Sequence, residues 1–255
     1  MEEIYNKIKE VVLDSGKILL EADRDDLGIE SKEGNNNIVT KYDVLLQEKL
    51  KNELLSIVPE AKFMGEEGEN TDYKDAKYLF IVDPIDGTTN FSRGLKYSAI
   101  SCALLEDGKA VIGICYNPYA NELFEARIGN GAFLNGKPIH VSDRELKNGI
   151  LLSGCSPYYD DLREKSIMIH NKFSRIASDF RRFGSAVLEI CTIAAGRAEV
   201  YCELKLMPWD HAAAGLILKE AGGKISTVDG KDVDYLGPTT VIASNNKEDY
   251  LKYIS

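Results

Sequence analysis

The chain contains 255 residues with a net charge of −10, and 44% of them are hydrophobic, so it is long enough for one large domain or two small ones. The acidic balance and the lack of a basic stripe predict that nucleic acid is not a partner. No apolar run is long enough to span a membrane, and the acidic start Met1-Glu2-Glu3 does not resemble a signal peptide, so we expect no membrane association.

The cysteines and histidines predict neither a zinc site nor a redox centre. The cysteines are odd in number and lack Cys-x-x-Cys spacing, which favours buried, reduced thiols in a cytoplasmic protein. The histidines are scattered along the chain and do not form a metal triad. We expect His211 to be a surface or hydrogen-bonded histidine rather than a ligand.

Two helices and a polar loop are expected at the start of the chain. Apolar residues at helical spacing predict an amphipathic helix over about 2–22. The polar and charged stretch 23–37 is expected to be a solvated loop. Thr40 then precedes a second helix over about 41–57, whose first turn carries Asp43, an acid that also simply stabilises a helix N-terminus.

An apolar strand that ends in acids organises the rest of the chain. Residues 78–82 are apolar, mostly β-branched or aromatic, and lead directly into Asp83. We expect Pro84 to turn the chain sharply, so that Asp83, Asp86 and the carbonyl between them face one point. Crowded hard oxygen ligands of this kind suit Mg²⁺, Mn²⁺ or Ca²⁺ rather than zinc.

Short segments on either side extend this candidate site. Gly87-Thr88-Thr89 is expected to open a helix whose free N–H groups face a phosphate. Upstream, Glu66 and Glu67 lie between glycines at the end of another expected strand. Each piece also has an ordinary structural interpretation, because Asp-Gly and Thr-Thr are common turn and cap residues.

A meander of strands follows, and it predicts an α+β first half, residues 1–142, with an antiparallel sheet. Its turns carry Glu106-Asp107-Gly108 and the pairs Asn130-Gly131 and Asn135-Gly136, which are hairpin signals. The strands are expected at about 97–105, 109–116 and 121–127.

From about residue 143 to 255 strands and helices alternate, which suggests α/β layering in a second half that forms one catalytic unit with the first. Strands are expected at 150–152, 178–182, 199–203, 224–226 and 240–244, and helices at about 158–177, 184–196 and 210–221. Asp210 opens the last helix, where it is either a simple N-cap or an acid that reaches the Asp83 and Asp86 pair. Glu203 could point into the same cleft.

Taken together, these segments resemble the inositol monophosphatase family. The motifs that carry the resemblance are Val39-Thr40-Lys41-Tyr42-Asp43, Gly65-Glu66-Glu67, Asp83 to Phe91, Gly131 to Ile139, and Trp209 to Gly215. The resemblance implies an α+β protein with a layered α-β-α-β-α sandwich, usually a homodimer. It also implies a lithium-inhibited phosphomonoesterase that uses two to three Mg²⁺ ions per site, with Mn²⁺ as a substitute.

The match assigns roles to individual residues of this sequence. Glu66, Asp83 and the Ile85 carbonyl would hold the first metal, and Asp83, Asp86 and Asp210 the second. Their chemistry agrees, because a phosphate dianion cannot share a pocket with several carboxylates unless cations are present.

The same match implies that Asp43, Glu66 and Thr88 orient the attacking water. The residues implied to contact the substrate are Asp86, Gly87, Thr88, Gly184, Ser185, Ala186, Glu203 and Asp210.

Other interpretations stay open at this stage. An aspartyl-phosphate phosphatase of the haloacid dehalogenase type also has two acids after a strand, but only one residue separates them there. A metal or phosphate sensor without catalysis is a second alternative. Within the enzyme hypothesis, we expect a small sugar or polyol phosphate, first of all inositol 1-phosphate. The other candidates are fructose 1,6-bisphosphate, NADP 2′-phosphate and 3′-phosphoadenosine 5′-phosphate, and Arg181, Arg182, Lys205 and Tyr158 are candidate ligands for a second phosphate.

Overall fold

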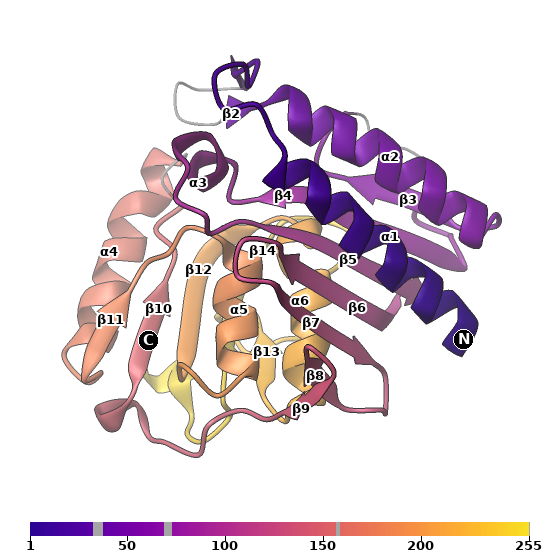
Figure 1. Ribbon diagram of the computed structural model, residues 1–255. Helices are drawn as coiled ribbons and strands as arrows, with labels where there is room; N and C mark the ends of the chain where they lie inside the picture. Colours follow the sequence, from indigo (N-terminus) through magenta and orange to yellow (C-terminus); the bar gives the residue numbers. More distant parts are fainter. Residues whose placement is uncertain (33–37, 69–72, 157–158, 255) are drawn as a thin grey trace.

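The computed structural model describes residues 1–32, 38–68, 73–156 and 159–254. Within these residues, helices and two β-sheets stack in five alternating layers (Figure 1). The helices are α1 (Glu2–Leu20), α2 (Lys41–Ile57), α3 (Thr88–Arg93), α4 (Asp160–Ser174), α5 (Ala186–Ala194) and α6 (Pro208–Glu220). Helices α1 and α2 cover the outer face of the first sheet, α5 and α6 lie between the sheets, and α4 covers the second sheet. The predicted α-β-α-β-α sandwich is confirmed.

The first sheet has the strand order β3-β4-β5-β6-β7-β8-β9 among the described residues. Its strands are β3 (Lys62–Gly65), β4 (Tyr78–Asp86), β5 (Ala99–Glu106), β6 (Lys109–Asn117), β7 (Glu122–Arg127), β8 (Ala132–Leu134) and β9 (Lys137–Ile139). Neighbours pair antiparallel except β3 and β4, which are parallel, so the predicted antiparallel sheet is confirmed for every pair but this one. The parallel pair matters for function, because it brings the carboxyl ends of both strands to one edge.

The predicted sharp turn at Pro84 was wrong. Strand β4 continues through Pro84 to Asp86, and its pairing with β5 shifts register between Asp83 and Asp86. A register shift is one of the few places in a sheet that tolerates proline, because the missing N–H falls where the ladder is interrupted. The acids therefore belong to the distorted end of a buried strand.

Two of the three predicted hairpin turns have the backbone that their residues predict, and the third pair, Asn130-Gly131, lies in a longer connection between β7 and β8. Asp107 and Gly108 have φ angles of 48° and 75°, and Asn135 and Gly136 have φ angles of 51° and 73°. Two consecutive positive φ angles define the type I′ turn that suits the twist of paired strands. Local chemistry thus decides where β5 joins β6 and where β8 joins β9.

The second sheet is mixed and has the order β11-β10-β12-β14-β13 among the described residues. Its strands are β10 (Ile150–Ser153), β11 (Asp179–Arg181), β12 (Val200–Leu206), β13 (Lys224–Ser226) and β14 (Thr239–Ser244). Strand β10 is parallel to both of its neighbours, as expected for α/β layering. Each sheet takes its strands from one predicted half of the chain. Helix α6 of the second half nevertheless packs on the first sheet. The division at residue 142 stays a prediction.

Alternation along β4 shows why the sheet separates two cores. Phe80 and Val82 pack under α1 and α2, whereas Leu79 and Ile81 face the layer of α5 and α6. Successive strand residues point to opposite faces, so a strand that is apolar throughout is buried on both sides. A third apolar cluster, which includes Leu151 of β10, lies under α4.

The loop predicted over 23–37 contains structure at its edges. Strand β1 (Glu30–Ser31) pairs antiparallel with β2 (Ile38–Val39), and residues 33–37 lie outside the described residues. The all-loop prediction for this stretch was therefore wrong. Lys32 directly follows β1 and Thr40 directly follows β2, and both contact acids of the site described below.

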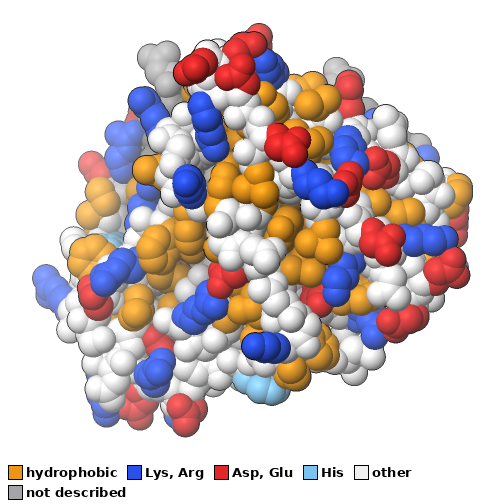
Figure 2. Space-filling model, in the orientation of Figure 1, with side chains coloured by type: hydrophobic (Ala, Val, Ile, Leu, Met, Phe, Trp, Pro, Cys, Tyr) orange, Lys and Arg blue, Asp and Glu red, His pale blue; other side chains and the backbone are white. Residues whose placement is uncertain are grey.

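The cysteines, the helices and the visible surface can be compared with what the composition predicted. The five cysteines are all free, and four of them are buried. In the described part of the chain, no helix has the length and apolarity needed to cross a bilayer. On the face shown in Figure 2, basic side chains are interspersed with acidic and hydrophobic ones. This face therefore carries no continuous basic stripe.

Candidate metal centre

Three predicted acids from distant parts of the sequence meet at one point. One carboxylate oxygen from each of Asp83, Asp86 and Asp210 lies within 4.8 Å of the other two. Asp83 and Asp86 come from the end of β4 and are 1% and 7% exposed, and Asp210 comes from the first turn of α6. We call these residues the acid triad.

Hydrogen bonds from the backbone hold each carboxylate of the acid triad. The Ile85 N–H donates to Asp83 Oδ1 at 2.9 Å, and the Met207 N–H donates to Asp210 Oδ2 at 2.7 Å. Asp86 Oδ2 accepts the Val187 N–H at 2.9 Å and the Ser185 hydroxyl. The oxygens therefore converge through contacts that the chain itself provides.

Electrostatics makes this arrangement costly without a cation. Burial raises the pKa of Asp83 well above its usual value, and the neighbouring carboxylates, Glu66 first, raise it further. Burial also raises the pKa of Asp86 to about 7, against the opposing hydrogen bonds from Ser185 and Val187. Burial and Asp86 raise the pKa of Asp210 well above its usual value. Clustered buried acids with raised pKa values are a common feature of functional sites.

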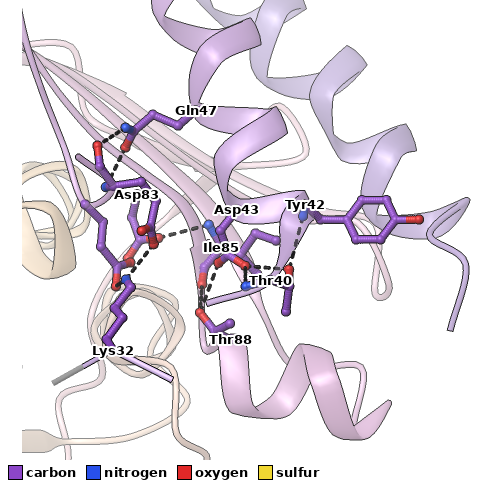
Figure 3. A network of polar contacts seen from close by, with 10 residues as sticks. Lys32, Thr40, Tyr42, Asp43, Gln47, Asp83, Ile85 and Thr88 are labelled. Atoms are coloured by element: carbon purple, nitrogen blue, oxygen red, sulfur yellow. Dashed lines mark hydrogen bonds and ion pairs between the residues drawn. The ribbon is translucent and has the colours of Figure 1, made fainter. Parts of the chain in front are cut away.

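Asp43 and Thr88 form a second unit beside the triad, shown in Figure 3. Thr40 caps α2, and its N–H and hydroxyl donate to Asp43 Oδ2 at 2.8 and 2.6 Å. This leaves Asp43 Oδ1 for the Thr88 hydroxyl at 3.1 Å, which lies equally close to the Ile85 carbonyl oxygen. Burial raises the pKa of Asp43 to about 6, so this carboxyl is poised to exchange a proton near neutral pH.

Glu66 and Glu67 lie at the rim and are held by a lysine. Lys32 Nζ lies 2.8 Å from Glu66 Oε1 and 2.6 Å from Glu67 Oε1 (Figure 3). Glu66 follows β3, whose parallel pairing with β4 brings it near Asp83. Gln47 of α2 adds support, because its Oε1 accepts the Glu67 N–H at 2.8 Å. Glu66 is predicted to be a metal ligand, but among the described acids it is not part of the acid triad's cluster.

The predicted substrate segments lie on the other side of the triad. Gly87 caps α3 with a φ of 89°, and a Cβ built on it would lie 3.1 Å from the Gly184 carbonyl oxygen. Ser185 caps α5 by accepting the Leu188 N–H at 3.2 Å, and Ala186 is the first residue of that helix. The structure thus brings both predicted segments into contact.

Glu203 lies in β12 and faces the same region. Its Oε1 accepts the Ser156 N–H at 3.0 Å, and its charge is close enough to raise the pKa of Asp210. Burial raises the pKa of Glu203 itself. Glu203 is therefore an acid beside the triad rather than part of it.

The expectation for His211 was wrong. The side chain is 0% exposed, stacks on Tyr235 with ring centroids 5.6 Å apart, and has no hydrogen-bond partner for either ring nitrogen among the described residues. Burial lowers the pKa of His211 to about 4, so the ring is neutral at physiological pH. It acts as a core aromatic of α6.

The candidate ligands for a second phosphate are engaged in other contacts. Arg181 forms an ion pair with Asp179 at 2.6 Å, and Lys205 Nζ lies 3.6 Å from the ring centroid of Tyr159. Arg182 lies near the charge of Glu203. Tyr158 falls outside the described residues.

Sequence analysis missed several residues that support the site. Lys32 was assigned to solvated surface, but its side chain is only 22% exposed and bridges two acids. Asn90 and Glu189 are 6% and 2% exposed, respectively, and hold the segment around Gly184. For Glu189, the sequence did offer a signal of a supporting role, because it is a charged residue within the otherwise apolar helix α5.

The fold and the acid triad together define a layered α+β protein with a candidate centre for a divalent cation. The family model described as the inositol monophosphatase family matches residues 1–255. The chain therefore belongs to the inositol monophosphatase family.

Individual relatives agree with this assignment. The chain is 37% identical over 216 residues to the Nus factor SuhB of Vibrio cholerae, covering 84% of this chain and 80% of that protein. It is 34% identical over 223 residues to the inositol-1-monophosphatase of Caulobacter vibrioides, covering 84% and 85%. A solved structure described as an IMPase/NADP phosphatase complexed with Mg²⁺ and phosphate has a TM-score of 0.85 and 25% identity, covering 99% of this chain and 93% of that chain.

The acid triad fits a divalent cation of the Mg²⁺ type. Its donors are hard carboxylate oxygens, with no cysteine or histidine among them. Their raised pKa values show that the pocket favours added positive charge. The nearby Lys32 pairs with Glu66 and Glu67 rather than with the triad. A bound cation would stabilise the ionised carboxylates and remove their mutual repulsion.

Proposed function

We propose that this protein is a Mg²⁺-dependent phosphomonoesterase that hydrolyses a small sugar or polyol phosphate, with inositol 1-phosphate as the first candidate. The observation that carries the proposal is the acid triad beside the Asp43 and Thr88 pair. Hydrolysis by activated water requires ligands for the metal ions that activate the water and a nearby acid that takes its proton. No protein nucleophile is needed in this scheme.

Each residue has a defined task in the proposed reaction. Asp83, Asp86, Asp210, Glu66 and the Ile85 carbonyl would hold two to three Mg²⁺ ions, for which Mn²⁺ would substitute. When bound, the ions neutralise the phosphate and lower the pKa of a water molecule.

The remaining steps use the chain's own groups. The Thr88 hydroxyl, which donates a hydrogen bond to Asp43, would orient the attacking water by accepting a hydrogen bond from it, and the water's proton would pass through Thr88 to Asp43. The water oxygen would bond to phosphorus as the bond to the alcohol oxygen breaks, and the alcohol would leave after taking a proton from solvent. The N–H groups of Gly87 and Thr88 would receive the phosphate. Segment Gly184-Ser185-Ala186 and Glu203 would bind the alcohol part, whose hydroxyls suit a carboxylate acceptor.

A phosphate-release assay on four substrates tests the proposal. Inositol 1-phosphate, fructose 1,6-bisphosphate, NADP and 3′-phosphoadenosine 5′-phosphate are compared with saturating Mg²⁺ and with chelator. We expect Mg²⁺-dependent turnover, fastest with inositol 1-phosphate. A protein that binds Mg²⁺ but hydrolyses none of them would instead favour the sensor alternative.

Two alternatives remain: a substrate with a second anionic group, and a reaction through a phosphoenzyme. The fructose 1,6-bisphosphate and NADP alternatives depend on Arg182 and Lys205 as ligands for a second anionic group. The haloacid dehalogenase alternative requires a phosphoenzyme on Asp83, whereas family membership and the triad argue for direct attack by water. Trapping a phosphoenzyme on Asp83 would reverse this choice.

Properties beyond the reaction stay predictions. Inhibition by millimolar Li⁺, a homodimeric assembly, a cytoplasmic location and the exclusion of nucleic acid were expected from the sequence or the family. The name Nus factor SuhB belongs to relatives of this chain and does not by itself decide whether this chain binds nucleic acid. Inhibition curves, sedimentation and a binding assay with RNA would test them separately.

A further inference from the structure

The segment Phe183–Ser185, between β11 and α5, is held from two sides by buried side chains. Glu189 Oε1 accepts the Phe183 N–H at 2.7 Å, and Asn90 Nδ2 donates to the Phe183 carbonyl oxygen at 2.7 Å. Glu189 belongs to α5 and Asn90 to α3, and they are 2% and 6% exposed. Both polar groups of one backbone residue are thus fixed by different elements.

The held segment touches both parts of the proposed active site. Ser185 and the Val187 N–H hydrogen-bond to Asp86 of the acid triad. On the other side, the Gly184 carbonyl oxygen packs against Gly87, which caps α3. Asn90 also donates to the Tyr97 carbonyl oxygen at 2.8 Å, so α3 and the residues that lead into β5 are tied to the same segment. A shift of Phe183 would therefore move a metal ligand and the alcohol-binding backbone together.

Glu189 is difficult to explain by stability alone. Burial raises its pKa to about 8, and the charges of Glu203 and Asp86 add to the increase against the Phe183 N–H and Arg182. A buried carboxyl loses its contacts with water, and its neighbours in α5 are apolar. A leucine here would avoid that cost but would leave the Phe183 N–H without its acceptor.

We propose that Glu189 is a positioning residue that, by accepting the Phe183 N–H, fixes the Phe183–Ser185 segment and through it the orientation of Asp86. The inference rests on the proposed phosphatase function for its kinetic consequences only. Its consequence for Mg²⁺ binding follows from the contact with Asp86. Groups that orient a metal ligand without touching the metal typically change metal affinity when they are removed.

Two variants separate the hydrogen bond from simple packing. Glu189→Gln keeps a carbonyl acceptor and, being neutral, resembles the protonated carboxyl that a pKa of about 8 implies at neutral pH. Glu189→Leu keeps similar volume and removes the acceptor. Glu125 is a matched control, because it is also 2% exposed but its carboxylate binds Tyr5 and Lys9 of α1.

The primary measurement is Mg²⁺ affinity, followed by the fluorescence of Trp209, the single tryptophan, next to Asp210. We expect Glu189→Leu to weaken Mg²⁺ binding about tenfold and to raise KM by a similar factor, with Glu189→Gln within about twofold of the wild type. Glu125→Leu should lower the unfolding temperature but leave Mg²⁺ affinity and KM unchanged.

Several outcomes would overturn the proposal. One is a folded Glu189→Leu protein with normal Mg²⁺ affinity and KM, and another is an equal loss in the leucine and glutamine variants. If Glu189→Leu does not fold, Asn90→Ala tests the other anchor of Phe183, and unchanged Mg²⁺ affinity there would count against the proposal. A wild type that binds Mg²⁺ but hydrolyses no phosphomonoester would refute the proposed function, while the Mg²⁺ titrations would still decide the role of Glu189.

Discussion

The acid triad and the rim acids Glu66 and Glu67 are two neighbouring acidic regions that the chain holds in different ways. The triad's carboxylates are fixed by backbone N–H groups and by the Ser185 hydroxyl. The rim acids are 21% and 11% exposed at their side chains, and Lys32 from another segment neutralises both. Burial by itself lowers the pKa of Lys32, but the two acids outweigh burial and raise it.

The triad is therefore a preformed arrangement of carboxylates, whereas at the rim the partner of the acids can be exchanged. The fold itself holds the geometry of the triad. A bound cation would offset the charge of its carboxylates. The rim already has a cation that belongs to the chain. If Glu66 is to serve as a metal ligand, as the family match implies, its contact with Lys32 must be exchanged for the metal.

The largest effect is expected when the triad itself is broken. Asp86→Asn removes a ligand charge but keeps a side chain of the same shape, so we expect turnover to fall roughly a thousandfold or more while the protein stays folded. Assays of kcat over a range of Mg²⁺ concentrations, with thermal unfolding, check this. Asp229→Asn, which alters a surface ion pair with Lys231, is the control. Near-normal rates at low Mg²⁺ would contradict the assigned role.

The next largest effect is expected at Gly87, beside the triad. Its φ of 89° disfavours any side chain, and an alanine Cβ would lie 3.1 Å from two carbonyl oxygens, those of Tyr97 and Gly184. We expect Gly87→Ala to lower kcat/KM about a hundredfold, because small displacements of a positioned group are costly.

Gly94 provides a matched control for Gly87. It also has a positive φ, 70°, but nothing lies within 4 Å of a Cβ built there. Gly94→Ala should lose about 1 kcal/mol of stability from the left-handed backbone and keep its kcat/KM. Equal kinetic losses in both variants would show that backbone strain, not contact with Gly184, is responsible.

A smaller effect is expected when the rim loses its lysine. Lys32→Met removes the positive charge that competes for Glu66 and Glu67, so we expect Mg²⁺ to bind roughly fivefold more tightly, equivalent to about 1 kcal/mol. Lys49 is the matched control, because it bridges Asp14 and Glu53 with a similar exposure of 20%. Calorimetric titration of both variants gives the comparison. Weaker binding in Lys32→Met would mean that the lysine supports the metal site instead.

The smallest effect on turnover is expected for Glu189→Gln, which changes mainly how stability depends on pH. Its pKa rises from 4.5 to about 8 on folding, so the protein loses stability as pH increases from about 4.5 to 8. Glu189→Gln has no such group, so in chelator its unfolding temperature relative to wild type should increase over that range by about 7 °C, equivalent to about 4 kcal/mol. The measurement is calorimetry at pH 5 and pH 8.5. A difference that does not vary with pH would place the pKa of Glu189 near its ordinary value.

Local sequence predicted much of the fold and the three acids that meet in the triad. The run before Asp83 predicted a buried strand, Thr40 and Asp43 formed the expected helix start, and Asp107-Gly108 formed the expected turn. These features depend on backbone preferences and on contacts within a few residues. The predicted turn at Pro84 was wrong because β4 pairs with β5 on both sides of the proline, at Asp83 and again at Asp86.

The sequence by itself determined the family, the three acids of the triad, and the strand and helix that present them. Only the tertiary structure decided that Lys32 binds the rim acids, that His211 is buried, and that Glu189 holds Phe183. The physical reason is the range of the interactions. A cap or a turn is decided by neighbours along the chain, whereas a partner for a buried charge is decided by which distant elements pack against it.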